Sequence, residues 1–146
     1  MPDVVVVGVD GSENAWRALD WAKDEAKLRG AGLRIVCSFE DPVSMVGIST
    51  AFGSNSPITV DPALIEDAAT AVVEEARRRV GGEVHAELVA RCDRPAPVLC
   101  EASRDAALLV VGSRGHKTVG SLLLGSVSNY VVHHSSCPVV IVPHEA

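Results

Sequence analysis

Short apolar runs alternate along this chain with longer segments in which apolar residues recur at helical spacing. The runs that have the length of buried strands are Val4 to Val9, Leu33 to Phe39, Glu83 to Arg91, Ala107 to Val111 and Val139 to Val142. The segments with helical periodicity are about Glu13 to Arg29, Pro62 to Val80, about Pro95 to Ser103, and Ser126 to His134. This alternation predicts a parallel sheet that is covered by helices.

The connections between these elements predict the order of the strands. Parallel strands joined by right-handed crossovers form an open, doubly wound sheet, so we expect a Rossmann-like α/β fold with strand order 3-2-1-4-5 and helices on both faces. Ligands of such sheets bind beyond the carboxyl ends of the strands where the order reverses, which is between strands one and four. Asp10 and Gly112 stand at those two ends. Two segments that are distant in sequence are therefore predicted to meet at one crevice.

Residues at the segment ends support the predicted boundaries. Ser12 is a suitable N-cap for the first helix, and Asp61 followed by Pro62 suits the start of the second. Between these helices, Glu40 to Val60 is rich in Ser, Gly and Pro and has no sustained period, which predicts a long loop. Such loops are either lids or simply flexible, and we expect this one to become ordered when a ligand binds.

The composition limits the classes of protein to which the chain can belong. Its 146 residues suffice for one domain, residues 1–146, whose core needs no disulfide or metal. A net charge of −6 without a basic cluster, together with an aromatic content of 3%, argues against nucleic-acid binding. No apolar run approaches the roughly 18 residues of a membrane span, and no secretion signal follows Met1. We therefore expect a cytoplasmic protein that does not bind membranes.

Cysteine and histidine residues form no recognisable metal site. The cysteines are Cys37, Cys92, Cys100 and Cys137. They include no C-x-x-C pair and no histidine at zinc-ligand spacing, so we interpret them as buried thiols of a reducing compartment. The adjacent His133 and His134 face apart on a predicted helix and have no evident third ligand.

The strongest chemical signal lies in the last third of the chain. After Val111 comes Gly112-Ser113-Arg114-Gly115 and, nine residues later, Gly125-Ser126-Val127-Ser128. The amides of Ser126, Val127 and Ser128 would stand unpaired at a helix start, where the helix dipole also favours an anion. The spacing Gly-x2-Gly-x9-Gly-Ser therefore predicts a phosphate site. It is no Walker motif, because Lys117 lacks the preceding glycine and the loop length.

This spacing resembles that of the universal stress protein family, whose ATP-binding members carry it. The amino end also fits, since Val4-Val5-Val6-Val7 runs into Gly8-Val9-Asp10-Gly11-Ser12, and Cys137 to Pro143 is similar to the family's last strand. The resemblance covers nearly the whole chain. It implies an adenine nucleotide alpha hydrolase-like fold, ATP as the ligand, and Mg or Mn held through the phosphates. It also implies a homodimer through Val139 to Val142, and an apolar edge strand invites such pairing on physical grounds.

The resemblance further implies roles for individual residues. Val9 would lie beside the adenine, Asp10 would face the ribose or a phosphate-bound divalent metal ion, and the backbone of Ser38 would read the adenine edge. The other nucleotide-binding residues, chiefly around the phosphates and ribose, would be Val111, Gly112, Arg114, Gly115, Gly125, Ser126, Val127 and Ser128.

Each of these roles has a structural alternative. Asp10 can instead be a turn aspartate that caps the first helix, Ser38 an ordinary strand residue, and Arg114 a solvated loop residue. The glycines and serines of the motif can serve as turn and cap residues alone. In addition, Cys92 stands where many family members have glycine, which gives the adenine side of the crevice a bulkier wall.

Three functions are compatible with these sequence features. The first is an ATP-binding regulator of stress or growth-arrest physiology, with slow ATP hydrolysis at most. The second is an enzyme on the same fold, and it is disfavoured because the chain has no Gly-x-Ser-x-Gly elbow, no paired carboxylates near Asp10 and no Ser-Gly-Gly-x-Asp loop. The third is a dimeric scaffold without nucleotide, which the intact glycine spacing argues against. The sequence favours the regulator and implies no catalytic residue.

Overall fold

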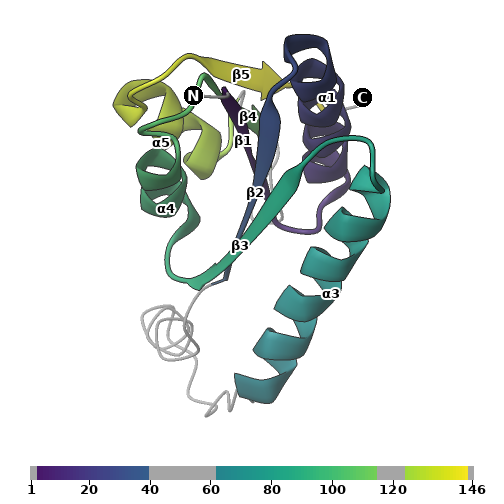
Figure 1. Cartoon of the computed structure of the whole chain (residues 1–146). Coiled ribbons are helices and arrows are strands. Elements are labelled where there is room, and N and C mark those ends of the chain that lie inside the picture. Colours follow the sequence, from purple (N-terminus) through teal and green to yellow (C-terminus); the bar gives the residue numbers. More distant parts are fainter. Residues whose placement is uncertain (1–2, 40–61, 115–123, 145–146) are drawn as a thin grey trace.

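The chain forms a sheet of five parallel strands with helices on both faces (Figure 1). The computed structural model describes residues 3–39, 62–114 and 124–144. Its strands are β1 (Val4–Val9), β2 (Gly32–Phe39), β3 (Ala86–Cys92), β4 (Leu108–Gly112) and β5 (Val139–Val142). They pair in the order β3-β2-β1-β4-β5, and each pair is parallel. The predicted fold class and strand order are confirmed.

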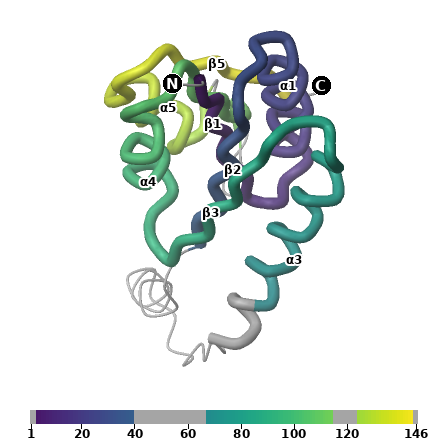
Figure 2. Tube along the Cα trace, in the orientation of Figure 1, coloured from purple at the N-terminus to yellow at the C-terminus, as the bar shows by residue number. Residues whose placement is uncertain are grey.

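Helices cover the two faces of the sheet in pairs (Figure 2). The helices of the described residues are α1 (Glu13–Arg29), α3 (Pro62–Val80), α4 (Pro95–Ala102) and α5 (Ser126–His134). Because strand side chains alternate between faces, Val5, Val7 and Ile35 pack in one core with α1 and α3. Val6 and Leu109 pack in a second core on the other face, with α4 and α5. The strands therefore carry buried side chains on both faces, as their continuous apolar runs predict.

Several predicted boundaries shift by one to three residues. Strand β2 begins at Gly32 rather than Leu33, β3 ends at Cys92 rather than Arg91, and β4 runs from Leu108 to Gly112 rather than from Ala107 to Val111. The third strand begins at Ala86 rather than Glu83, because Ala86 pairs with Leu33 near the start of β2. The Glu83 carboxylate instead bonds Lys23 of α1, with 3.0 Å between Nζ and Oε2. Helix α4 ends one residue early, since Ser103 is its C-cap and its hydroxyl donates to the Cys100 carbonyl at 2.9 Å.

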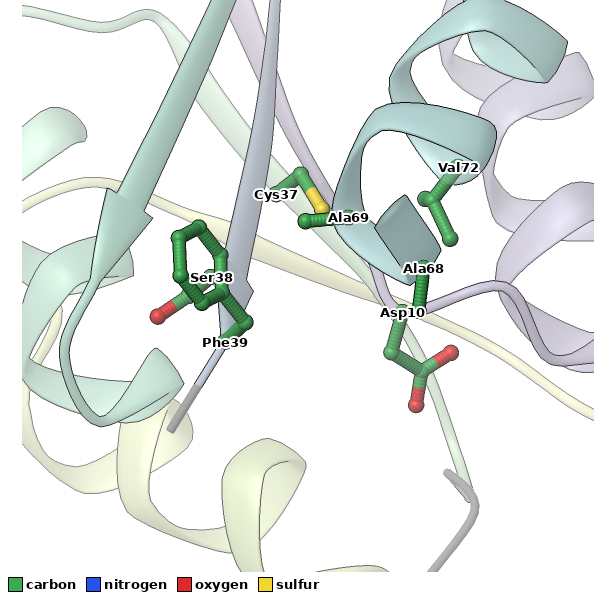
Figure 3. A pocket seen from close by; sticks show the side chains of 7 residues that line it. All are labelled: Asp10, Cys37, Ser38, Phe39, Ala68, Ala69 and Val72. Atoms are coloured by element: carbon green, nitrogen blue, oxygen red, sulfur yellow. The ribbon is translucent and has the colours of Figure 1, made fainter. Parts of the chain in front are cut away.

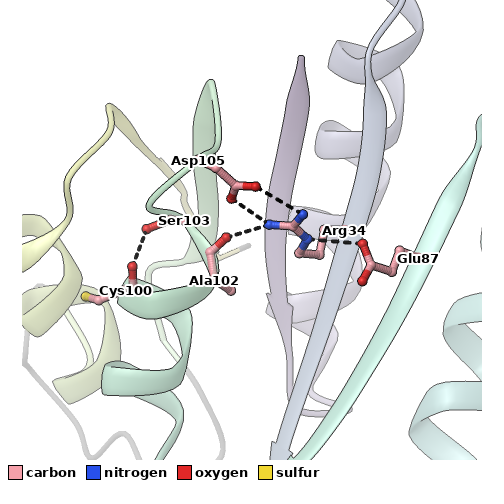
Figure 4. Close-up of polar contacts among 6 residues, drawn as sticks. All are labelled: Arg34, Glu87, Cys100, Ala102, Ser103 and Asp105. Atoms are coloured by element: carbon pink, nitrogen blue, oxygen red, sulfur yellow. Dashed lines mark hydrogen bonds and ion pairs between the residues drawn. The ribbon is translucent and has the colours of Figure 1, made fainter. Parts of the chain in front are cut away.

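One arginine ties several elements together near the amino ends of the strands (Figure 4). Arg34 of β2 donates to the Ala102 carbonyl at the end of α4 at 2.8 Å, and to Asp105 at 2.9 Å. Its Nε donates to Glu87 of β3 at 3.2 Å. The hydrogen bond from Arg34 holds the pKa of Asp105 below its usual value, and the same bond raises the pKa of Arg34. At the amino edge of the sheet, where the strands begin, the charge of Arg34 is therefore paired with two carboxylates.

The cysteines differ in exposure, which corrects part of the prediction. All are free thiols; Cys37 is buried, Cys100 and Cys137 are half-buried, and Cys92 is exposed. Cys92 escapes burial because it ends β3, the strand at the edge of the sheet. None of the described helices is long and apolar enough to cross a membrane.

Some predictions fall outside the described residues. These are the loop from Glu40 to Val60, the proposed N-cap Asp61, and Gly115 in the middle of the glycine motif.

Candidate functional site

The carboxyl ends of β1 and β4 mark the place where the strand order reverses. Strand β1 pairs with β2 on one side and with β4 on the other. The helices that follow β1 and β4, α1 and α5, lie on opposite faces of the sheet (Figure 1). Ligands of such folds usually bind between strand ends placed in this way, which is where the sequence predicts a crevice. Asp10 and Gly112 stand at those ends, as predicted.

The loop after β1 is braced by its own side chains. Asp10 Oδ1 accepts from the Ser12 amide at 2.9 Å and from the Ser12 hydroxyl at 2.6 Å. Ser12 in turn accepts from the Ala15 amide at 3.2 Å as the N-cap of α1. Gly11 has a φ of 86°, which favours glycine. Asp10 therefore serves the turn, the structural alternative that the sequence left open, and it is exposed at the crevice as well.

A pocket of about 230 Å³ lies beside this loop (Figure 3). Strand ends contribute Asp10, Cys37, Ser38 and Phe39, and α3 contributes Ala68, Ala69 and Val72. Figure 3 shows the Cys37 thiol pointing toward α3 and the Asp10 carboxylate beside Ala68. The pocket is thus lined mainly by apolar groups with one carboxylate, as many small-molecule sites are. The lining from α3 was not predicted.

The thiol in this pocket is not poised as a nucleophile. Burial raises the pKa of the Cys37 thiol, and the negative charge of Asp10 raises it further. A thiol with a raised pKa stays protonated at neutral pH and packs as a small apolar group.

Ser38 uses its side chain to fix the next loop. Its hydroxyl donates to the backbone carbonyl of Asp93, which follows β3. Cys92, just before, pairs in register with Phe39 of the pocket. The end of β3 therefore stands against the pocket side of the crevice, where the sequence predicts a bulkier wall.

The loop after β4 starts against a buried side chain of α1. Asn14 is 7% exposed; its Oδ1 accepts from the Arg114 amide at 2.8 Å and from the Ser113 hydroxyl at 3.3 Å. A Cβ at Gly112 would lie 2.9 Å from Asn14 Cγ and Oδ1. Glycine is thus needed at position 112 because Asn14 lies so close, and not because of a positive φ. The sequence predicts a sharp turn or a close approach to a ligand at this glycine, and the structure adds the asparagine as the neighbour.

The two ends of the glycine motif meet in space. The Gly125 amide donates to the Ser113 carbonyl at 2.7 Å, and the Ser128 hydroxyl lies 3.2 Å from the same oxygen. Helix α5 begins after Gly125, which provides no side-chain cap. The amides of Ser126, Val127 and Ser128 belong to the first turn, which has no acceptors for them within the helix. Ser126 is exposed, whereas the Ser128 hydroxyl is buried and bonded to backbone.

The side chain of Arg114 carries a buried polar atom that no acceptor from the described residues contacts. This atom is Nε of the guanidinium group. Buried polar groups in folded proteins are nearly always paired, so an exception of this kind points to a role or to a missing ligand.

The structure brings most of the predicted residues to the carboxyl edge of the sheet, some with exposed side chains and some with buried ones. The side chains of Val9 and Val111 are buried in the two cores, which leaves the backbone of these residues for contact with a ligand. Sequence reasoning missed Asn14, although one signal existed: Asn14 precedes Ala18 by four residues and so extends the inward stripe of α1 with a polar side chain.

Within the described residues, no group of three or more His, Cys, Asp or Glu side chains could hold a metal ion.

Comparisons with known proteins agree on one family. The family model of the universal stress protein family matches residues 1–143. Universal stress protein Rv1996 of Mycobacterium tuberculosis is 32% identical over 160 residues, which cover 97% of this chain and 48% of that protein. The chain thus spans about half the length of the curated relatives it matches.

Solved structures extend the similarity to the fold. A universal stress protein in complex with cAMP is 28% identical, with a TM-score of 0.67 and 97% of both chains covered. The protein MJ0577 has a TM-score of 0.78 at 19% identity, with 100% of this chain and 99% of that chain covered, and supports the fold alone. On the evidence of the family model above all, the chain belongs to the universal stress protein family.

Proposed function

We propose that this chain binds ATP at the carboxyl edge of the sheet and acts as a nucleotide-dependent regulator. The observation that carries the proposal is the presence of two complementary features at the carboxyl ends of neighbouring strands. An apolar pocket lies beside β1 and β2, and a helix start without a side-chain cap follows β4. A nucleotide has an apolar base at one end and phosphates at the other. A family member of 28% identity was solved in complex with cAMP, which also supports an adenine nucleotide as the ligand.

In this proposal, the apolar pocket binds the base and the start of α5 binds the phosphates. The base enters the pocket between Phe39 and Ala68, with the backbone of Ser38 at its edge. Asp10 at the pocket rim faces the ribose or an Mg or Mn ion held by the phosphates.

The phosphates lie at the start of α5, where amides and the helix dipole favour an anion. Ser126 offers an exposed hydroxyl there. Arg114 Nε, which has no acceptor among the described residues, gains one for a charge-assisted hydrogen bond. Gly115 is proposed as part of the same phosphate loop.

A regulatory role is favoured over catalysis by the state of the polar groups at the crevice. The Cys37 thiol is kept protonated, and Asp10 Oδ1 is engaged by two hydrogen bonds from Ser12. Neither group is arranged as a nucleophile or a general base. We propose that ATP hydrolysis is slow at most and that the protein acts in the cytoplasm in stress or growth arrest.

We also propose that two copies of the chain pair through β5. This strand is at one end of the sheet, and its Val139, Val140 and Ile141 are only partly buried. Such an edge offers unpaired backbone groups and apolar side chains to a second copy. Light scattering at micromolar concentration is expected to give the mass of a dimer, and a monomer with ATP present would refute the pairing.

Filling the pocket tests the nucleotide site. Ala68 is exposed and lines the pocket, so Ala68→Phe is expected to occupy the space of the base without disturbing the core. Ala71 is exposed on the same helix away from the pocket, and Ala71→Phe is the matched control. Calorimetry should show ATP binding to the wild type and the control, with affinity lowered about tenfold or more in Ala68→Phe. Equal affinity of the two variants would place the base elsewhere.

A further inference from the structure

We propose that Asn14 is a positioning residue for the phosphate loop, and that it couples the start of this loop to the end of β5. The loop start is defined here as Gly112, Ser113 and Arg114. This inference rests on the proposed nucleotide site and adds a residue on α1 that touches no nucleotide in that site. Asn14 acts through the backbone of the loop.

The first observation is the set of hydrogen bonds that Asn14 makes. Its side-chain oxygen accepts from the amide of Arg114 at 2.8 Å and from the hydroxyl of Ser113 at 3.3 Å. Its side-chain nitrogen donates to the carbonyl of Val142 at 3.0 Å. One amide group therefore contacts two residues of the loop start and the last residue of β5. All three bonds are buried or partly buried, where a lost partner is costly.

The second observation is the fit between Asn14 and Gly112. A Cβ at Gly112 would stand 2.9 Å from both Cγ and Oδ1 of Asn14. These distances are shorter than Cβ contacts in real proteins, so any larger residue at 112 must push Asn14 aside. The glycine of the motif therefore makes room for the asparagine, and the two positions depend on each other.

The third observation is that the end of β5 is bound to the same loop by further contacts. The Val142 carbonyl also accepts from the Ser113 amide at 2.9 Å. The Ser113 hydroxyl accepts from the His144 amide at 3.1 Å. Since Val142 offers its oxygen to both Ser113 and Asn14, a displacement of the loop start has to change the contacts of β5. A ligand that fixes the loop thereby also fixes the strand that we propose to pair two subunits.

The coupling is tested first in the protein without nucleotide. Asn14→Ala removes the acceptor of the Arg114 amide, whose hydrogen exchange is expected to become about tenfold faster by NMR. Asn14→Asp keeps an acceptor of the same size but cannot donate to Val142. In this variant the Arg114 amide is expected to stay protected, while the His144 amide exchanges faster. Unchanged exchange at Arg114 in Asn14→Ala would overturn the proposal.

The role in nucleotide binding is tested by comparing two ligands. Asn14→Ala is expected to lower the affinity for ATP about tenfold and to leave the affinity for adenosine unchanged, because the proposed site uses this loop to hold phosphates, which adenosine lacks. Gly112→Ala is expected to act in the same way, and the double variant should lose no more than either single one. Equal losses for ATP and adenosine would mean a general structural defect and would refute positioning. If wild-type protein binds neither ligand, the proposed function itself fails, which the wild-type titration reveals separately.

Discussion

The amino edge and the carboxyl edge of the sheet, where the strands begin and end, differ in how their polar groups find hydrogen-bond partners. At the amino edge, the guanidinium of Arg34 bonds a helix-terminal carbonyl and two carboxylates, so charges and backbone ends there are satisfied by the chain itself. At the carboxyl edge, α5 begins without a side-chain cap, and Arg114 Nε has no partner within the described part of the chain. The difference separates a region that stabilises the fold from the region where we propose that a ligand binds.

The helix starts at the carboxyl edge show the same contrast on a smaller scale. Helix α1 is capped by Ser12, which accepts from the Ala15 amide. Helix α4 has no side-chain cap, but Pro95 and Pro97 in its first turn carry no N–H to satisfy. Helix α5 combines an uncapped start with the donors of Ser126, Val127 and Ser128. Of these three starts, α5 is thus the one equipped to bind an anion.

A side-chain cap introduced at the start of α5 should have the largest effect on ATP affinity without lowering the stability of the fold. Gly125 is buried, and its φ of −69° and ψ of 168° are extended values that any residue adopts without backbone strain. In Gly125→Asp, the carboxylate is expected to accept from the first-turn amides and to repel phosphates. Calorimetry should show affinity for ATP lowered roughly 100-fold, with an unfolding free energy that is no lower than that of the wild type.

Gly82→Asp is the control for the added negative charge. No atom of the described residues lies within 4 Å of a Cβ at Gly82, which is exposed at the opposite edge of the sheet. The control should bind ATP as the wild type does. If Gly125→Asp retains wild-type affinity, the phosphates do not lie at the start of α5.

Removal of the guanidinium at the amino edge should have the reverse effect. Arg34→Met leaves the Ala102 carbonyl without its donor and separates Asp105 and Glu87 from their partner. Urea unfolding is expected to show a loss of about 2 kcal/mol, with ATP affinity unchanged. Arg104→Met, at an exposed site nearby, should lie within about 0.5 kcal/mol of the wild type. A fall in ATP affinity for folded Arg34→Met would contradict the prediction that the amino edge stabilises the fold without contributing to binding.

The cap of α1 should have a smaller effect on stability. Ser12→Ala removes the acceptor of the Ala15 amide and the hydroxyl that bonds Asp10. The expected loss in unfolding free energy is about 1 kcal/mol, as for other N-caps. Ser136→Ala, at an exposed serine outside any helix, serves as the control in the same urea titration. A stability equal to that of the control would show that α1 does not depend on its cap.

The smallest effect concerns pH at the amino edge. The pKa of Asp105 is lowered in the folded state by the hydrogen bond from Arg34. Its contribution to stability is therefore present above the unfolded pKa of about 3.9 and is lost as the pH falls through the lower folded value. Asp105→Asn should be less stable than the wild type near neutral pH, and the difference should shrink below about pH 4. A difference that stays constant with pH would contradict the charged pair.

Much of the fold was predictable because the signals are local. Short apolar runs, helical periodicity and the N-cap at Ser12 place α1, α5 and most of the strands to within a few residues. The start of β3 was not, since it depends on where β2 begins and on the bond between Glu83 and Lys23 of α1. Such contacts between distant segments leave no periodic trace in the sequence.

The site was predictable where it consists of backbone and not where it consists of side chains from several elements. The glycine spacing assigned Gly112 and Gly125 to one predicted phosphate site, and the structure places Gly125 against Ser113, the neighbour of Gly112. It did not reveal that Asn14 occupies the space beside Gly112, or that α3 lines the pocket. Both facts arise from packing between segments that are far apart in the chain.

Native mass spectrometry can decide whether the carboxyl edge of the sheet is an ATP site. Wild-type protein purified without added nucleotide is mixed with equal concentrations of ATP and FMN, with Gly125→Asp treated in parallel. If the start of α5 holds the phosphates, each wild-type chain carries one ATP and the variant carries none. Bound FMN, no bound ligand in the wild type, or ATP on both proteins would contradict this assignment.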